Sequence, residues 1–132
     1  MNICLIGYNL TNFLLAILLS KKGFEVDIIF DEKNKSKTNN RTIGISKKNI
    51  EFLKSILNIP NQYLWPILQI EILNLKNDPS KKIKFKDKKD ENFFLIKQSD
   101  LLQLSLKKCK QLKNIYFSKY TPKEILKLEK TN

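Results

Sequence analysis

Three positions near the amino terminus have the spacing of a turn that holds a phosphate group. Residues 7–12 read Gly-Tyr-Asn-Leu-Thr-Asn, which is the pattern G-x-G-x-x-G with asparagine at its second and third glycine positions. In that pattern the glycines allow a tight turn after a strand, a close approach of the backbone to a pyrophosphate, and close packing of helix on strand. We predict that Gly7, Asn9 and Asn12 form a degenerate turn of this kind. Asparagine is tolerated at position 9 because it can adopt left-handed backbone angles, although its side chain crowds the phosphate.

A carboxylate and an arginine follow this turn. Asp31 directly follows an apolar run, at the distance where a dinucleotide-binding unit places the acid that accepts hydrogen bonds from the adenosine ribose. Glu32 satisfies the same spacing. The alternative to a ribose-binding role is that Asp31 is simply a polar residue that ends the strand. Arg41 is the one arginine beside 24 lysines, which suggests a bidentate or stacking role for its planar guanidinium group, with chance as the alternative. No residue stands out as a catalytic acid or base.

A strand–helix–strand unit over residues 1–32 is predicted to position the turn and the acid. Residues 2–6 are an apolar run typical of a strand buried on both faces of a parallel sheet. Helical spacing begins at Leu10, and Gly23 ends the helix after Lys21 and Lys22. A second strand covers residues 25–30. This order is a βαβ unit, and the predicted fold class is therefore α/β and Rossmann-like.

The remaining chain predicts a small inserted antiparallel sheet within residues 62–98, followed by a return to the parallel sheet. The expected elements are a helix over 47–57 capped by Ser46, strands over 67–75, 82–86 and 93–96, a helix capped by Ser99 or Asp100 and ending near 112, and a strand over 115–118. Residues 33–40 are expected to form an exposed loop. We predict one domain over residues 1–120, with 121–132 as a tail.

The strongly basic composition does not by itself indicate nucleic acid. The formal net charge is +12, carried almost entirely by lysine in a chain rich in asparagine and isoleucine, which is the bias of an AT-rich genome. A dedicated nucleic-acid surface more often uses arginine, whose fork pairs with phosphates and guanines. We therefore expect a solvated basic surface and no specific nucleic-acid site.

Cysteine usage and the amino terminus predict a reduced, cytoplasmic protein. Cys4 and Cys109 are too few for a disulfide framework, and without histidine the sequence offers no metal site. Both thiols are expected to be buried or partly buried. The apolar runs near the amino terminus lack a preceding basic region and are too short to cross a membrane.

The order of these features resembles the class A flavoprotein aromatic hydroxylases, and most closely the branch that hydroxylates the ubiquinone-precursor ring. The resemblance rests on residues 3–12, on Lys-Gly-Phe-Glu-Val-Asp-Ile-Ile-Phe-Asp at 22–31, on Arg-Thr-Ile-Gly-Ile-Ser at 41–46 with the helix after it, and on residues 65–75 and 93–102. It implies FAD as cofactor, NAD(P)H as reductant, and hydroxylation of a lipid-like aromatic ring with O2. It also allows peripheral association with the inner membrane.

The resemblance also implies residue roles. Gly7, Asn9 and Asn12 would hold the pyrophosphate, Asp31 would bind the adenosine ribose, and Arg41 would lie near the flavin side of FAD. The family has a further arginine before its next helix, where this sequence reads Lys-Gln-Ser at 97–99.

Length separates this chain from the family, whose members are about three times as long. A second FAD motif and the sheet that covers the aromatic substrate have no room in 132 residues. The resemblance therefore implies a truncated FAD-binding domain that is incomplete alone. It would be a truncated product, one half of a split enzyme that a companion chain completes, or the product of a decayed gene. The alternatives are a Rossmann-like nucleotide-binding or interaction module without catalysis, and a basic protein that binds nucleic acid or an anionic membrane.

Overall fold

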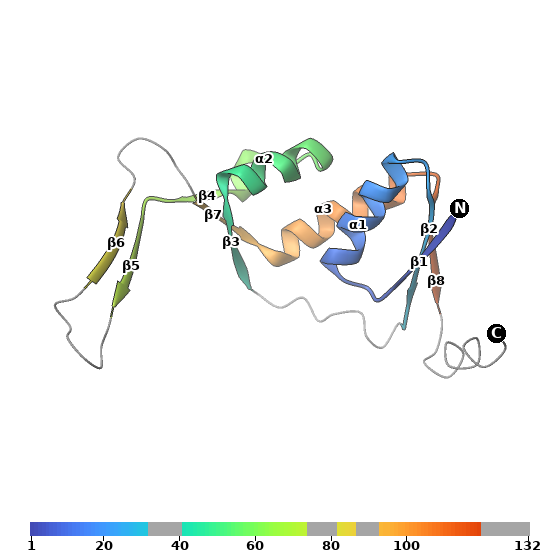
Figure 1. Cartoon of the computed structure of the whole chain (residues 1–132), viewed down its shortest axis with the longest axis horizontal. Coiled ribbons are helices and arrows are strands. Elements are labelled where there is room, and N and C mark those ends of the chain that lie inside the picture. Colours follow the sequence, from blue (N-terminus) through green and yellow to red (C-terminus); the bar gives the residue numbers. More distant parts are fainter. Residues whose placement is uncertain (32–40, 74–81, 87–92, 120–132) are drawn as a thin grey trace.

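A parallel sheet stands at one end of the molecule (Figure 1). The computed structural model describes residues 1–31, 41–73, 82–86 and 93–119. Sheet A consists of β1 (Asn2–Ile6), β2 (Glu25–Phe30) and β8 (Ile115–Lys119) in the order β1-β2-β8. The pairing of β8 with β2 is parallel, which confirms the predicted return of the chain to this sheet.

The first helix, α1 (Leu10–Lys21), joins β1 to β2 and ends as the sequence predicts. Gly23 has a φ of +86°, which L side chains rarely adopt. Its N–H donates to the carbonyl of Ser20 at 3.0 Å, and the N–H of Phe24 donates to the carbonyl of Leu19 at 3.2 Å. These two bonds form a Schellman ending, which satisfies carbonyls that the helix itself leaves unpaired.

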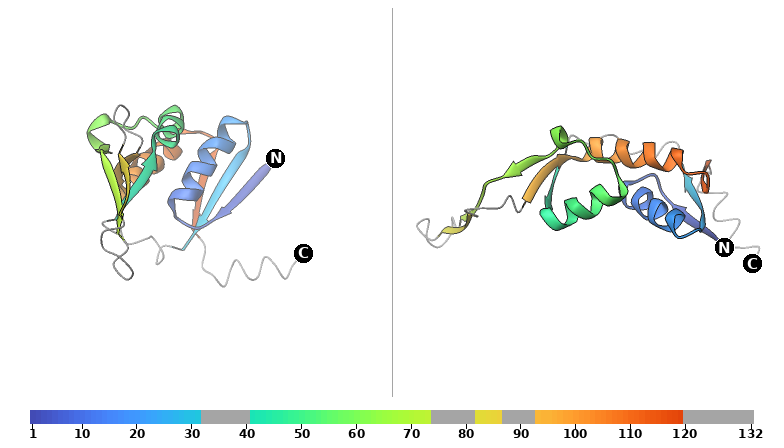
Figure 2. Two further views of the ribbon diagram at one scale, coloured as in Figure 1. Left: turned by 60° about the vertical axis from the view of Figure 1, so that its left-hand side comes forward. Right: turned by 90° about the horizontal axis from the view of Figure 1, so that it is seen from above.

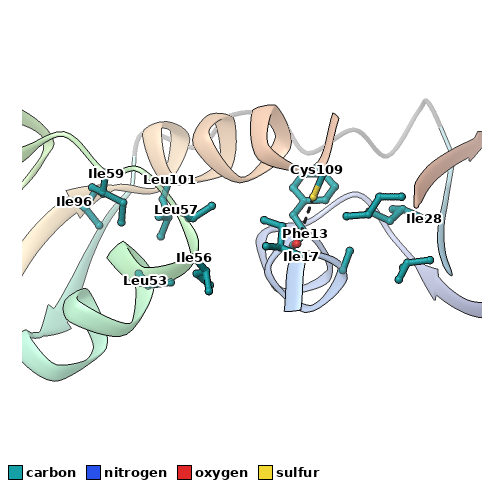
Figure 3. Close-up of a cluster of buried hydrophobic side chains, with 13 residues drawn as sticks. Phe13, Ile17, Ile28, Leu53, Ile56, Leu57, Ile59, Ile96, Leu101 and Cys109 are labelled. Atoms are coloured by element: carbon teal, nitrogen blue, oxygen red, sulfur yellow. Dashed lines mark hydrogen bonds between the residues drawn. The ribbon is translucent and has the colours of Figure 1, made fainter. Parts of the chain in front are cut away.

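The third helix, α3 (Gln98–Gln111), packs against α1 on the same side of sheet A (Figures 1 and 2). The buried side chains of Phe13 and Ile17 on α1, Ile28 on β2 and Cys109 on α3 form one part of the core (Figure 3). Leu101, near the start of α3, lies in the other part with Leu57, Ile59 and Ile96. The thiol of Cys109 donates to the carbonyl of Phe13 at 3.4 Å. The βαβ unit and the helix that follows the inserted strands therefore share one core.

Sheet B is antiparallel and has the order β3-β7-β4. It consists of β3 (Thr42–Ser46), β7 (Phe93–Lys97) and β4 (Trp65–Ile67). The second helix, α2 (Lys47–Ile56), follows β3 directly, and Ser46 accepts from the N–H of Asn49 at 3.4 Å, which confirms the predicted cap. The short 3-10 helix η2 (Asn61–Tyr63) leads into β4.

A separate two-stranded sheet projects at the far end from sheet A (Figure 1). It pairs β5 (Gln69–Leu73) with β6 (Lys82–Lys86) in antiparallel register. The strand predicted over 67–75 is present as β5, but its start is wrong, because Ile67 belongs to β4, a distinct strand of a different sheet. Leu68 lies between them and is 73% exposed. The inserted strands thus form two small sheets, and β3 belongs to the first of them.

Three further expectations about local structure are wrong. Strand β1 alternates between exposed and half-buried residues and is not covered on both faces, because it lies at the edge of sheet A with the helices on one side only. Cys4 is exposed for the same reason. The α3 helix begins earlier than predicted: Lys97 is its N-cap, without a side-chain bond, and neither Ser99 nor Asp100 caps it.

Some predictions lie outside the described residues. These are the loop over 33–40, the tail over 121–132 and the alternative acid Glu32. Within the part of the chain that the structure describes, no helix has both the length and the apolar character needed to cross a bilayer.

Candidate functional site

The degenerate turn lies at the carboxyl edge of sheet A. Residues Ile6 and Ile29 are register partners at the ends of β1 and β2. The N–H of Gly7 donates to the carbonyl of Ile29 at 2.7 Å, so the turn is tied to the neighbouring strand. In open parallel sheets, ligands bind outside the carboxyl ends of the strands. The position of the turn is therefore the one that the sequence predicts.

Gly7 is required by the backbone of this turn. Its φ is +117°, a value at which any L side chain is strained. A Cβ atom there would also lie 3.0 Å from Nδ2 of Asn9 and 3.4 Å from Nδ2 of Asn12. The first glycine of the pattern thus keeps the role that the sequence assigns to it, which is to let the chain turn tightly after β1.

The two asparagines form hydrogen bonds within the turn. Oδ1 of Asn9 accepts from the backbone N–H of Asn12 at 3.0 Å, which makes Asn9 the N-cap of α1. The side-chain amide of Asn12 donates to the carbonyls of Ile6 at 2.8 Å and of Gly7 at 2.9 Å. Asn9 has a φ of −146° and a ψ of 164°. The expected left-handed conformation is therefore wrong, because Asn9 is extended. It stabilises the fold as the N-cap of α1.

Asp31 directly follows β2 and is half-buried. Because β2 is parallel to β1, its carboxyl end lies at the same edge of the sheet as the turn. The structure thus brings the predicted acid and the predicted phosphate turn to one edge. The role of Asp31 toward a ribose stays a prediction.

An aromatic cluster beneath the turn was not predicted. The ring of Tyr8 lies 4.8 Å from that of Phe13 and 5.0 Å from that of Phe30, and Phe117 contacts both phenylalanines at 6.2 and 6.5 Å between centroids. Burial raises the pKa of Tyr8 above its ordinary value. The signal in the sequence was weak, because these residues come from the turn, α1, β2 and β8 and converge only in the folded chain. The cluster supports the turn from below.

Arg41 lies beside a different segment. It is exposed and directly precedes β3, and its carbonyl accepts from the N–H of Gln98 at 2.8 Å. Thr42 and Lys97 are register partners. The structure therefore places Arg41 next to residues 97–99, the segment in which the resemblance implied a further arginine. A role of Arg41 toward a flavin stays a prediction.

The main chain of this edge has the backbone features of a dinucleotide-binding turn, and a side chain of the same turn is bonded to one of its amides. The turn has the positive φ at Gly7, the helix amino terminus and the parallel strand ends that a pyrophosphate site requires. The N–H of Asn12, in the first turn of α1, is already bonded to Asn9. A role of Gly7, the amino end of α1 and Asp31 toward a dinucleotide stays a prediction.

Together these features define an α/β unit of the dinucleotide-binding kind joined to a small antiparallel sheet, which is the fold of FAD-dependent monooxygenases. No family model matches the sequence, and no curated protein matches it. Solved structures do match in fold.

Three of the similar structures are monooxygenases or oxygenases. PqsL, a probable FAD-dependent monooxygenase from Pseudomonas aeruginosa, matches with a TM-score of 0.65 and 12% identity over 90% of this chain and 32% of that one. The p-nitrophenol 4-monooxygenase PnpA from Pseudomonas putida DLL-E4 matches with a TM-score of 0.67 and 14% identity, covering 89% of this chain and 31% of that one. A mutant of 2-methyl-3-hydroxypyridine-5-carboxylic acid oxygenase matches with a TM-score of 0.65 and 15% identity, with the same coverage of 89% and 31%.

The chain therefore has the fold of about a third of such an enzyme, since it covers 28–33% of the solved chains that it matches. The predicted α/β fold class, with its Rossmann-like unit and inserted antiparallel strands, is confirmed by this likeness.

Proposed function

We propose that this chain is the FAD-binding portion of an FAD-dependent monooxygenase, which holds the adenosine end of the cofactor and is completed by a companion polypeptide. The observation that carries the proposal is the single edge of sheet A at which Gly7, the amino end of α1 and Asp31 meet. The likeness in fold to three oxygenases gives this edge its chemical interpretation. When bound, FAD would supply the redox chemistry, and this chain would supply binding and orientation.

The proposal of a companion rests on the outer face of sheet A. Ile6 is 63% exposed and Tyr116 is 50% exposed on the face opposite the helices. Asp27 lies between them on the same face, and both of its carboxylate oxygens lie 2.8 Å from the hydroxyl of Ser118. About two-thirds of each matched oxygenase has no counterpart in this chain. A companion surface that offers apolar side chains and a hydrogen-bond donor opposite Asp27 would cover this face.

The finer assignments belong to the same proposal. The substrate would be an electron-rich aromatic ring of the ubiquinone-precursor type, and NAD(P)H would be the reductant. Support for the aromatic class comes from the likeness in fold to a nitrophenol monooxygenase and a hydroxypyridinecarboxylate oxygenase. The cytoplasmic location and the peripheral association with the inner membrane stay predictions.

The test is a titration of the purified chain with FAD, followed by desalting and a visible absorbance spectrum. We expect flavin bands to remain with the protein. Asp31→Asn should weaken binding by about tenfold, because hydrogen bonds to a charged group contribute about 1.5–3 kcal/mol. Glu25→Gln is the matched control, since this exposed carboxylate lies at the amino end of the same strand and should leave the affinity unchanged.

A chain that stays colourless in both the wild-type and control forms would contradict the proposal.

A nucleotide-binding module without catalysis is the second candidate, favoured by the likeness to only a third of each oxygenase. Binding of ADP or NAD with an affinity equal to that of FAD would support it. Retention on DNA that falls steeply with salt, without flavin binding, would instead favour the basic-protein alternative.

A further inference from the structure

The side chain of Asn9 occupies a backbone amide that a phosphate group would use. The first N–H groups of an α-helix have no partner within the helix, and this is why helix amino termini bind anions. In α1 the N–H of Phe13 bonds to the carbonyl of Asn9 at 3.1 Å, which is the first bond of the helix. The N–H of Asn12, just before it, donates to Oδ1 of Asn9 at 3.0 Å. An oxygen of a bound pyrophosphate and Oδ1 of Asn9 would therefore compete for this amide.

The backbone does not require asparagine at this position. Asn9 has φ −146° and ψ 164°, an extended conformation that any residue adopts. Glycine at the same position would leave the N–H of Asn12 free and would remove the side chain that faces the turn. Asn12 plays a different part, because its side-chain amide donates to the carbonyls of Ile6 and Gly7 and holds the turn in shape.

We propose that Asn9 sets the affinity of this turn for dinucleotides: its side chain takes the place of a phosphate oxygen, and FAD binds only when that side chain rotates away from the N–H of Asn12. The inference rests on the proposed function, since it concerns the same edge of sheet A. It assigns the two asparagines opposite roles. Asn9 opposes the ligand, and Asn12 maintains the turn that receives it.

The experiment compares FAD binding by the full chain and its variants, measured by quenching of flavin fluorescence. Asn9→Gly should bind FAD about fivefold more tightly than the wild type, because no cap has to be broken before the phosphate is bound. Asn9→Ser is the matched control: serine is also a strong N-cap, and its hydroxyl keeps an acceptor near the same amide, so its affinity should stay close to that of the wild type. Asn12→Ala should bind more weakly than the wild type.

A second measurement reports on the cap without any ligand. The amide of Asn12 should exchange slowly in the wild type and in Asn9→Ser, and faster in Asn9→Gly, as measured by NMR. Equal affinity of the wild type and Asn9→Gly for FAD would overturn the inference and leave the proposed function standing. Absence of FAD binding by every variant, with the fold intact by circular dichroism, would overturn both.

Discussion

Cys4 and Cys109 differ in what surrounds their sulfur atoms. Cys109 is fully buried between α3 and α1, where desolvation raises the pKa of its thiol to about 12. Cys4 is exposed on the outer face of sheet A, and partial desolvation, with a further contribution from the negative charge of Asp27, raises its pKa above the ordinary value. Because a thiolate is the reactive form, a raised pKa lowers the reactivity of both residues at neutral pH.

Labelling with iodoacetamide should separate the two thiols. In the folded protein at pH 8 we expect slow modification of Cys4 and none of Cys109, with both modified quickly in denaturant. The rate at Cys4 should rise as pH rises toward its pKa, since the thiolate fraction grows. Asp27→Asn should speed the reaction of Cys4, because it removes the charge that disfavours the thiolate. Rapid modification of Cys109 under native conditions would show that the α1–α3 contact is not closed.

At the scale of the element, the end of α1 depends on one glycine. Gly23→Ala would place a Cβ at a φ of +86°, and we expect it to lower the free energy of unfolding by about 1–2 kcal/mol, as measured in urea. No atom lies within 4 Å of a Cβ built on Gly23, so the expected loss comes from backbone strain and not from a clash.

Gly44→Ala is the matched control for that change. Gly44 lies in β3, no atom lies within 4 Å of its added Cβ, and its φ is outside the range that glycine favours. The free energy of unfolding of this variant should differ from that of the wild type by less than about 0.5 kcal/mol, or be slightly higher, because alanine lowers the entropy of the unfolded chain. Equal losses in the two variants would contradict the role of the Schellman ending.

The elements that the sequence predicted well are those with strong local signals. The βαβ unit has an apolar run, a helical repeat and a stop glycine in succession, and all three of its elements appear at the expected positions. The α2 helix begins after Ser46, whose oxygen accepts as a cap should. These signals depend on residues that are close together in the chain, so they can be recognised from the sequence alone.

The features that the sequence did not predict depend on partners that lie far away in the chain. Residues 67–73 contain no glycine, proline or asparagine that would mark a break, so nothing local shows that β4 pairs with β7 while β5 pairs with β6. Asn114 directly precedes β8. Its side-chain amide donates to the carbonyls of Ser20 at 3.1 Å and Phe24 at 2.7 Å, which joins the start of β8 to the end of α1.

The candidate site shows the same division. The spacing of Gly7, Asn9 and Asn12 indicated the turn, and the apolar run before Asp31 indicated the acid at the strand end. The hydrogen bonds of the two asparagines depend on side-chain orientation, which a pattern of glycine positions does not specify. The aromatic support from Phe30 and Phe117 depends on β8 pairing with β2 across most of the chain.

At the scale of the whole molecule, sheet A has one covered face and one open face. Val26 and Ile28 point toward the helices and are fully buried, whereas Ile6 and Tyr116 on the other face are at least half exposed. Leu15, on α1, is also 40% exposed. Apolar side chains gathered on one face of a sheet usually mark a surface that meets another protein. If the chain has the companion polypeptide proposed above, the open face is where we expect it to bind.

Substitutions on the two faces should therefore differ in how strongly they lower the free energy of unfolding. Ile6→Thr on the open face should change the free energy of unfolding by less than about 0.5 kcal/mol, because little is buried there in the isolated chain. Ile28→Ala on the covered face should lower it by about 2–5 kcal/mol, as large-to-small changes do in a core. Both values come from urea unfolding followed by circular dichroism.

A double variant on the open face tests the exposed surface directly. The isolated chain should enhance the fluorescence of a dye that binds apolar surfaces, and a double variant with Ile6→Thr and Tyr116→Thr should reduce that signal while the far-ultraviolet spectrum stays unchanged. A companion polypeptide that binds the wild type should bind the double variant at least tenfold more weakly, since the centre of an interface carries most of its binding free energy. An undiminished dye signal would place the apolar surface elsewhere on the molecule, and undiminished binding of the companion would show that it docks on another face.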